Sequence, residues 1–97
     1  MASNDYVRSE WQELLKFSKE MNNFAEKLET QMKALSRETS AITSTAWRDK
    51  QGARFAQSIE MSKKDMLKST QKLKELSVGV EKKARELKEI EELRIKL

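Results

Sequence analysis

The sequence predicts an all-α protein, a two-helix antiparallel hairpin (helix-turn-helix) that pairs with a second hairpin into a four-helix bundle. Three observations predict this fold. The 97 residues include no proline and only two glycines, Gly52 and Gly79, so little interrupts a helix. Apolar residues recur at heptad spacing through two long segments. A cluster of Ser and Thr separates these segments. We expect one domain, residues 1–97.

The first helix is expected at about 5–43, with Asp5 or Ser3 as its N-cap. Steps of four and three residues define a heptad seam in which nine of eleven positions are apolar. The positions are Val7, Trp11, Leu14, Ser18, Met21, Ala25, Leu28, Met32, Leu35, Thr39 and Ile42. A seam of this length predicts a long helix that packs at a shallow angle.

The connection is expected at about 44–49, where Ser and Thr compete for backbone hydrogen bonds and weaken the helix. Asp49 is a suitable N-cap for a second helix at about 50–95. The same stepping gives a second seam with nine apolar positions of thirteen. They are Phe55, Ile59, Ser62, Met66, Ser69, Leu73, Leu76, Val80, Lys83, Leu87, Ile90, Arg94 and Leu97.

Apolar residues beside the two seams predict a protein partner. Two helices cannot cover both the seams and the flanking side chains, which are Leu15, Phe17, Phe24, Met61, Leu67 and Leu93. We expect Trp11, Phe17, Phe24 and Leu67 at the interface with a related hairpin. Homodimer and heterodimer both remain open.

The composition excludes several kinds of chemistry. The chain has no His and no Cys, so it offers no thiolate nucleophile, imidazole base or zinc site. It has no Gly-rich phosphate loop and no EF-hand loop. We therefore expect no enzyme activity, no catalytic residue, no metal and no cofactor.

The net charge of +4 lies in the second half of the sequence. Residues 51–97 hold twelve Lys and Arg against eight Asp and Glu, whereas residues 1–50 hold eight of each. The basic residues could bind nucleic acid, but the carboxylates between them favour a solubilising face. No apolar run has the length of a membrane span, and no signal peptide precedes the first helix. We expect export by a leaderless route, or a cytoplasmic location.

Trp47-Arg48-Asp49 lies at the expected turn, and Phe55 follows the Trp by eight residues. With the hairpin layout, this spacing resembles the WXG superfamily of type VII (ESX) secretion. Asp49 replaces the family's Gly, and both residues suit an N-cap. Exported members often end in Tyr-Xaa-Xaa-Xaa-Asp/Glu, but the single tyrosine here is Tyr6.

The resemblance implies a non-enzymatic secreted substrate, or a small helical partner or chaperone of a larger substrate. The alternative is a cytoplasmic coiled-coil adaptor or structural interaction protein without an export role. The turn motif of Trp47, Asp49 and Phe55 would then form a recognition surface. On this view Trp47→Ala leaves stability almost intact and abolishes partner binding or export, whereas Phe55→Ala, at the start of the second seam, costs stability.

Overall fold

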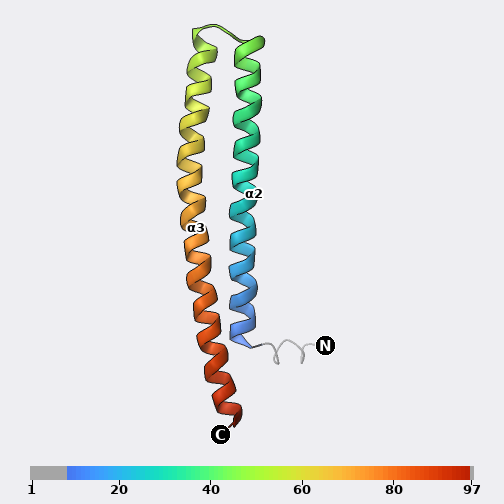
Figure 1. Cartoon of the computed structure of the whole chain (residues 1–97), viewed down its shortest axis with the longest axis vertical. Helices are drawn as coiled ribbons and strands as arrows, with labels where there is room; N and C mark the ends of the chain where they lie inside the picture. The colour runs from blue at the N-terminus through green and yellow to red at the C-terminus, as the bar shows by residue number, and fades with distance from the viewer. Residues whose placement is uncertain (1–8, 97) are drawn as a thin grey trace. The chain divides into compact units, whose positions relative to one another are not determined.

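The computed structural model describes residues 9–96 and contains two α-helices. Helix α2 runs over Glu10–Thr45 and α3 over Lys50–Lys96, joined by a short turn (Figure 1). The two helices pack against each other, and there is no strand in the described residues. The prediction of an all-α helical hairpin is therefore confirmed.

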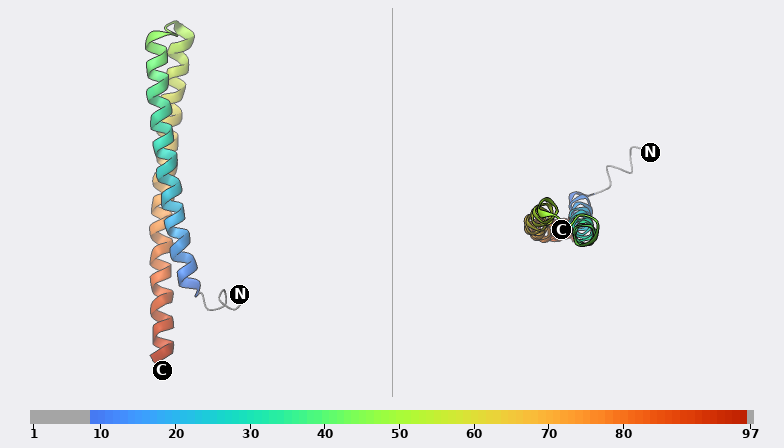
Figure 2. Two further views of the ribbon diagram at one scale, coloured as in Figure 1. Left: turned by 90° about the vertical axis from the view of Figure 1, so that its right-hand side faces the viewer. Right: turned by 90° about the horizontal axis from the view of Figure 1, so that it is seen from above.

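The hairpin divides into two compact units. The turn unit is residues 24–72, and the open-end unit comprises residues 9–23 and 73–96 of the described chain. In each unit a segment of α2 lies beside a segment of α3 (Figure 2). Because the chain reverses at the turn, the two segments run antiparallel.

Helix α2 starts with a cap that the sequence analysis overlooked. The Ser9 backbone N–H donates to Gln12 Oε1 at 3.0 Å, and the Gln12 N–H donates to the Ser9 carbonyl at 3.1 Å. Ser9 and Gln12 have the spacing of a capping box, in which the side chain three residues on reaches back to the N-cap. The proposed caps Ser3 and Asp5 lie outside the described residues.

In the turn unit, small residues fill the contact between α2 and α3. Ala25, Ser36 and Thr39 of α2 are buried, and so are Gly52 and Thr70 of α3. Side chains this small allow two helix backbones to approach closely, since little volume separates them. The seam of this unit is therefore narrow and partly hydroxylic.

The open-end unit has the same kind of seam. Its buried residues are Ser18 of α2 with Ser77 and Ala84 of α3. The larger neighbours Leu14, Met21 and Leu73 are half-buried.

The buried seam differs from the predicted heptad seam at alternate positions. Leu35 and Ile42 are exposed, while Ser36 is buried and Thr43 is half-buried. The other predicted seam residues that the structure leaves exposed are Phe55, Ser62, Ser69, Leu76, Lys83, Ile90 and Arg94. The prediction is wrong at these positions because, at most of them, the buried seam is displaced by one residue toward the C-terminus. At Leu35 and Leu76 the displacement buries the small neighbours Ser36 and Ser77 and leaves the large residue outside. Val7 and Leu97 lie outside the described residues.

Two side-chain hydrogen bonds join α2 to α3 in the turn unit. The Thr70 hydroxyl donates to Glu29 Oε2 at 2.7 Å, and the Ser36 hydroxyl donates to Glu60 Oε2. In residues 9–96, no buried side-chain nitrogen or oxygen lacks a hydrogen-bond partner. The hydroxyl seam therefore carries no unmet desolvation cost.

Candidate interaction surfaces

The turn is fixed by hydrogen bonds on both sides. The N–H groups of Ala46 and Trp47 both donate to the Ile42 carbonyl at 2.9 Å and close the last turn of α2. On the other side, the Gly52 N–H donates to Asp49 Oδ1 at 2.8 Å. This bond is the N-cap that the sequence predicted for Asp49, and it satisfies one of the free amides at the start of α3.

Gly52 is the residue that lets Trp47 pack against the start of α3. A Cβ at Gly52 would overlap the Trp47 carbonyl oxygen and lie 3.1 Å from Trp47 Cγ. By contrast, a Cβ at Gly79 would meet nothing within 4 Å. Gly52 is therefore a steric requirement of the turn, five residues after the Trp.

Trp47 and Phe55 form an aromatic pair beside the turn. Their ring centroids are 5.5 Å apart, with the ring planes tilted by 36°. Trp47 is half-buried, whereas Phe55 is 45% exposed. Phe55 therefore does not begin the buried seam, as the sequence analysis expected, because Gly52 occupies that place.

In the turn unit, an apolar stripe runs along α2 beside the seam. It consists of Phe24, Leu28, Leu35 and Ile42, of which all but the half-buried Leu28 are exposed. At 3.6 residues per turn these positions lie on one side of α2, about a quarter turn from Ser36. Viewed along each helix from its N-terminus, Phe55 is rotated away from the α3 seam in the same direction as the stripe is rotated away from the α2 seam. Because the helices run antiparallel, these rotations place Phe55 and the stripe on the same side of the hairpin.

The open-end unit has a corresponding stripe, carried mainly by α3. Phe17 of α2 is 51% exposed, and Leu76 and Ile90 of α3 are 55% and 49% exposed. Leu87, between them, is half-buried. We call the apolar stripes of the two units the pairing stripes, and each leaves large side chains without cover in the hairpin itself.

The four expected interface residues occupy three different settings. Phe17 and Phe24 lie on the pairing stripes. Leu67 is half-buried and lies about a third of a turn around α3 from Phe55. Trp11 is half-buried and reaches across to α3, where Lys88 Nζ lies 5.1 Å from its ring centroid. The structure thus places Trp11 within the hairpin and Leu67 on another face.

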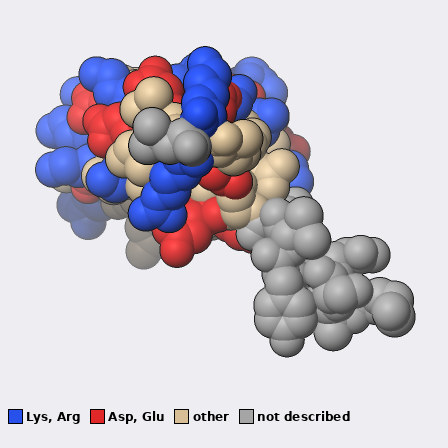
Figure 3. Space-filling view, turned by 90° about the horizontal axis from the view of Figure 1, so that it is seen from below, with Lys and Arg blue, Asp and Glu red and all other residues tan. Residues whose placement is uncertain are grey.

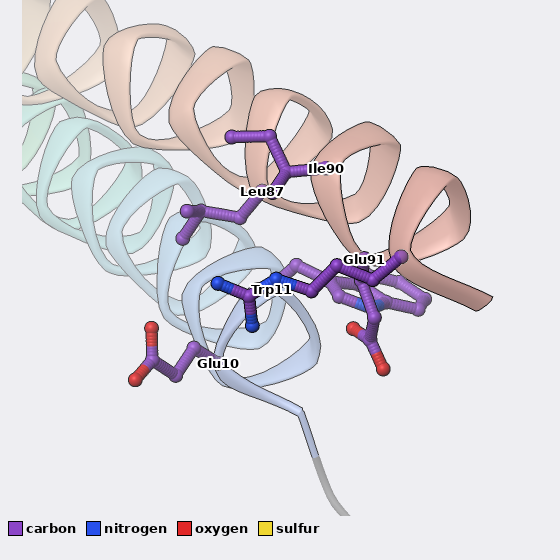
Figure 4. Close-up of a pocket in the computed structure, with 6 residues that line it drawn as sticks. Glu10, Trp11, Leu87, Ile90 and Glu91 are labelled. Carbon is purple, nitrogen blue, oxygen red and sulfur yellow. The ribbon is translucent and has the colours of Figure 1, made fainter. Parts of the chain in front are cut away.

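Trp11 also lines a hollow in the open-end unit (Figure 4). The hollow measures about 380 Å³, and its walls are Glu10, Trp11, Leu87, Ile90, Glu91 and Arg94. Figure 4 shows Trp11 projecting from α2 toward the part of α3 that carries Leu87 and Ile90. The walls of the hollow combine three apolar and three charged side chains.

One exposed carboxyl beside the seam has a shifted pKa. The Ser36 hydroxyl stabilises the Glu60 carboxylate by its hydrogen bond and lowers the pKa of Glu60 from 4.5, and Lys63 and Lys64 lower it further. Lys63 Nζ lies 3.4 Å from Glu60 Oε1. This cluster links Ser36 of α2 with Glu60 and Lys63 of α3.

Within residues 9–96, no group of three or more His, Cys, Asp or Glu side chains could hold a metal ion. No helix in this part of the chain combines the length and apolarity that crossing a membrane requires.

Comparison with known proteins gives the family. Residues 7–92 match the model of the WXG100 family, described as proteins of 100 residues with WXG. The chain belongs to the WXG100 family. No curated protein and no solved structure matches it. Family membership makes it a small helical protein associated with type VII secretion.

This WXG100 protein departs from the motif that gives the family its name at the third position, where Asp49 stands for Gly. The structure gives the physical reason why the change is tolerated, since Asp49 caps α3 through its side chain. The close approach that does need a glycine occurs at Gly52, inside the first turn of α3.

Proposed function

We propose that this WXG100 protein acts in type VII secretion by pairing its hairpin with a second, related hairpin. It would travel as a substrate or hold a larger substrate as its small partner. The observation that carries the proposal is the uncovered pairing stripe of the turn unit, with Phe24, Leu35 and Ile42 exposed at 57%, 45% and 52%. The family supports this mode, since WXG100 proteins usually pair as helical hairpins.

The energetics favour association through these stripes. Burying a large apolar side chain contributes about 1.5–3 kcal/mol when it goes from full exposure to full burial. The exposed residues of the stripes are about half exposed, so several of them together contribute several kcal/mol to pairing. The narrow seam of small residues cannot supply this burial within one hairpin. Packing of two such faces produces a four-helix bundle.

Sedimentation of two matched variants tests the pairing. The first variant, Phe24→Gln with Leu35→Gln, changes the pairing stripe and keeps residues that favour helix. The control, Met61→Gln with Leu93→Gln, changes two side chains that are 62% exposed on other faces of α3. We expect the first variant to weaken association at least tenfold and the control to leave it unchanged.

Two outcomes would count against this surface. Equal weakening in both variants would mean that exposed apolar area, and not the stripe, drives association. A clean monomer for the unmodified chain at tens of micromolar would exclude a homodimer and direct the search to a related hairpin as heteromeric partner.

Export is tested separately from pairing. In the source cell, an epitope-tagged chain should accumulate in the medium only when the secretion ATPase is intact. Retention in the cell with pairing preserved would favour the alternative, a cytoplasmic coiled-coil adaptor.

A further inference from the structure

Folding gathers the excess positive charge into the turn unit. Residues 24–72 hold ten Lys and Arg against six Asp and Glu, whereas the described residues of the open-end unit hold nine of each. Figure 3 views the end of the molecule where α3 finishes, and there basic and acidic side chains are interleaved. The whole net charge of +4 therefore belongs to the half that contains the turn.

Within the turn unit, one face of α3 has basic residues and no carboxylate. Steps of four and three residues define it, and we call it the basic stripe: Lys50, Arg54, Gln57, Met61, Lys64, Lys68 and Gln71. All seven residues are exposed. Lys72 adjoins the stripe at one end. Elsewhere on α3, Lys and Arg alternate with Glu. A mixed surface of that kind is enough for solubility, so solubility does not explain a face that carries only positive charge.

The cations of the basic stripe are not neutralised by the protein itself. Lys50, Arg54 and Lys68 form no salt bridge with any residue in 9–96, whereas the lysines of the open-end unit include Lys83 paired with Glu86 and Lys88 paired with Glu92. Lys64 is near enough to Glu60 to lower its pKa by charge, without a salt bridge between the two. The other cations of the stripe are thus outside the ion pairs of the hairpin and can bind an external partner.

The basic stripe is also free when the hairpin is paired. Its residues lie on the side of α3 away from Phe55, so neither the seam nor the pairing stripe uses them. Beside it is a shallow, open hollow of about 590 Å³, lined by Lys64, Leu67, Lys68 and Gln71. Two ammonium groups at the rim of a partly apolar hollow suit a phosphate group that is attached to hydrocarbon.

We propose that the basic stripe is a docking site for an anionic phospholipid surface. Clusters of four to eight Lys and Arg on an amphipathic helix are typical of binding to acidic lipid headgroups. A straight stripe along one helix can place all its cations on a flat plane, and the exposed Met61 and half-buried Leu67 contact the headgroup layer. The stripe has no aromatic residue on which nucleic-acid bases would stack. Docking here goes beyond the pairing function and does not depend on it.

Vesicle binding of charge-matched variants tests the proposal. The stripe variant is Arg54→Gln with Lys64→Gln and Lys68→Gln. The control removes the same charge from exposed sites of the open-end unit: Lys82→Gln, Lys83→Gln and Lys96→Gln. Glutamine keeps the helix propensity in both variants. Circular dichroism and sedimentation confirm that each variant folds and pairs like the unmodified protein.

We expect the unmodified chain to bind vesicles of phosphatidylcholine mixed with phosphatidylglycerol, and not vesicles of phosphatidylcholine alone. At about a factor of five per cation near the surface, the stripe variant should lose about a hundredfold in affinity. The control should lose severalfold at most. Equal loss in both variants would overturn the proposal, because net charge alone would then drive binding. Absence of vesicle binding, or duplex DNA bound more tightly than vesicles through the same three residues, would also overturn it.

Discussion

At the scale of single residues, we expect alanine at the two glycines of α3 to have opposite effects on stability. Gly52→Ala places a Cβ against the Trp47 carbonyl, and we expect a loss of about 1–3 kcal/mol from the strain. Gly79→Ala meets open space and replaces the weaker helix former, which should add about 1 kcal/mol. Thermal unfolding followed by circular dichroism should show the melting temperature falling in the first variant and rising in the second. Two changes of the same sign would contradict the role of Gly52.

Asp49 allows a direct test of the motif departure. Asp49→Ala removes the bond to the Gly52 N–H and should cost about 1 kcal/mol. Asp49→Gly restores the usual Trp-Xaa-Gly and should cost only about a few tenths of a kcal/mol, because Gly is an acceptable N-cap. Chemical denaturation of the three proteins measures the difference. If Ala and Gly behave alike, Asp49 does not act through its side-chain cap.

The structure reverses the expected order of the turn aromatics. Trp47 packs on Gly52 and on Phe55, and it is less exposed than Phe55. We therefore expect Trp47→Ala to cost about 2 kcal/mol and Phe55→Ala about 1 kcal/mol, since each loses the aromatic contact and Trp loses more burial. Urea unfolding of both variants provides the comparison. The sequence could place these residues at the turn, but it could not show that Gly52 takes the seam position.

At the scale of the helices, the hairpin and its turn followed from the sequence, whereas the seam did not. Heptad stepping selects the larger apolar residue, so it favoured Leu35 over Ser36 and Leu76 over Ser77. The structure buries the small residue in both pairs. The deciding factor is the packing of one helix against the other, which a pattern within one helix does not contain. The Ser9–Gln12 capping box, however, was visible in the sequence.

The contact between Ser36 and Glu60 predicts a pH dependence. The folded pKa of Glu60 lies below 4.5, so its stabilising contribution is present above pH 4.5 and is lost as the pH falls through the folded pKa. Ser36→Ala removes the largest cause of that shift. We expect the difference in melting temperature between Ser36→Ala and the unmodified protein to be greatest at neutral pH and to shrink in acid.

Ser62→Ala, at an exposed site of α3, is the control and should show a constant difference across this range. A Ser36→Ala difference that does not change with pH would remove Glu60 from the account of stability.

At the scale of the whole molecule, stability should depend on protein concentration. The fully buried residues of the described chain are small, and several large apolar side chains lie exposed on the pairing stripes. A partner that binds only the folded hairpin therefore stabilises it by mass action. For a homodimer, raising the concentration about 100-fold should raise the melting temperature by several degrees. Scanning calorimetry over that range gives the result, and a constant melting temperature would exclude self-association as the stabilising step.

The distribution of charge over the folded protein is a second property that the order of residues in the sequence does not show. Counting along the chain assigns the excess to residues 51–97, but the turn unit combines parts of both halves. Only the fold shows that residues 24–72 carry all of it. In the sequence, Glu60 and Asp65 stand between the basic residues and favour a mixed solubilising face. On α3, neither carboxylate is among the residues of the basic stripe.

The hydroxyls of the seam have a mechanical consequence. Ser18 donates to the Leu15 carbonyl at 3.2 Å and Ser77 to the Lys74 carbonyl at 2.7 Å, so each bond stays within its own helix. Separating α2 from α3 therefore leaves these two hydroxyls with their acceptors. In the turn unit, the same separation breaks the Thr70–Glu29 and Ser36–Glu60 hydrogen bonds. The two units thus differ in what their buried hydroxyls lose when the helices part.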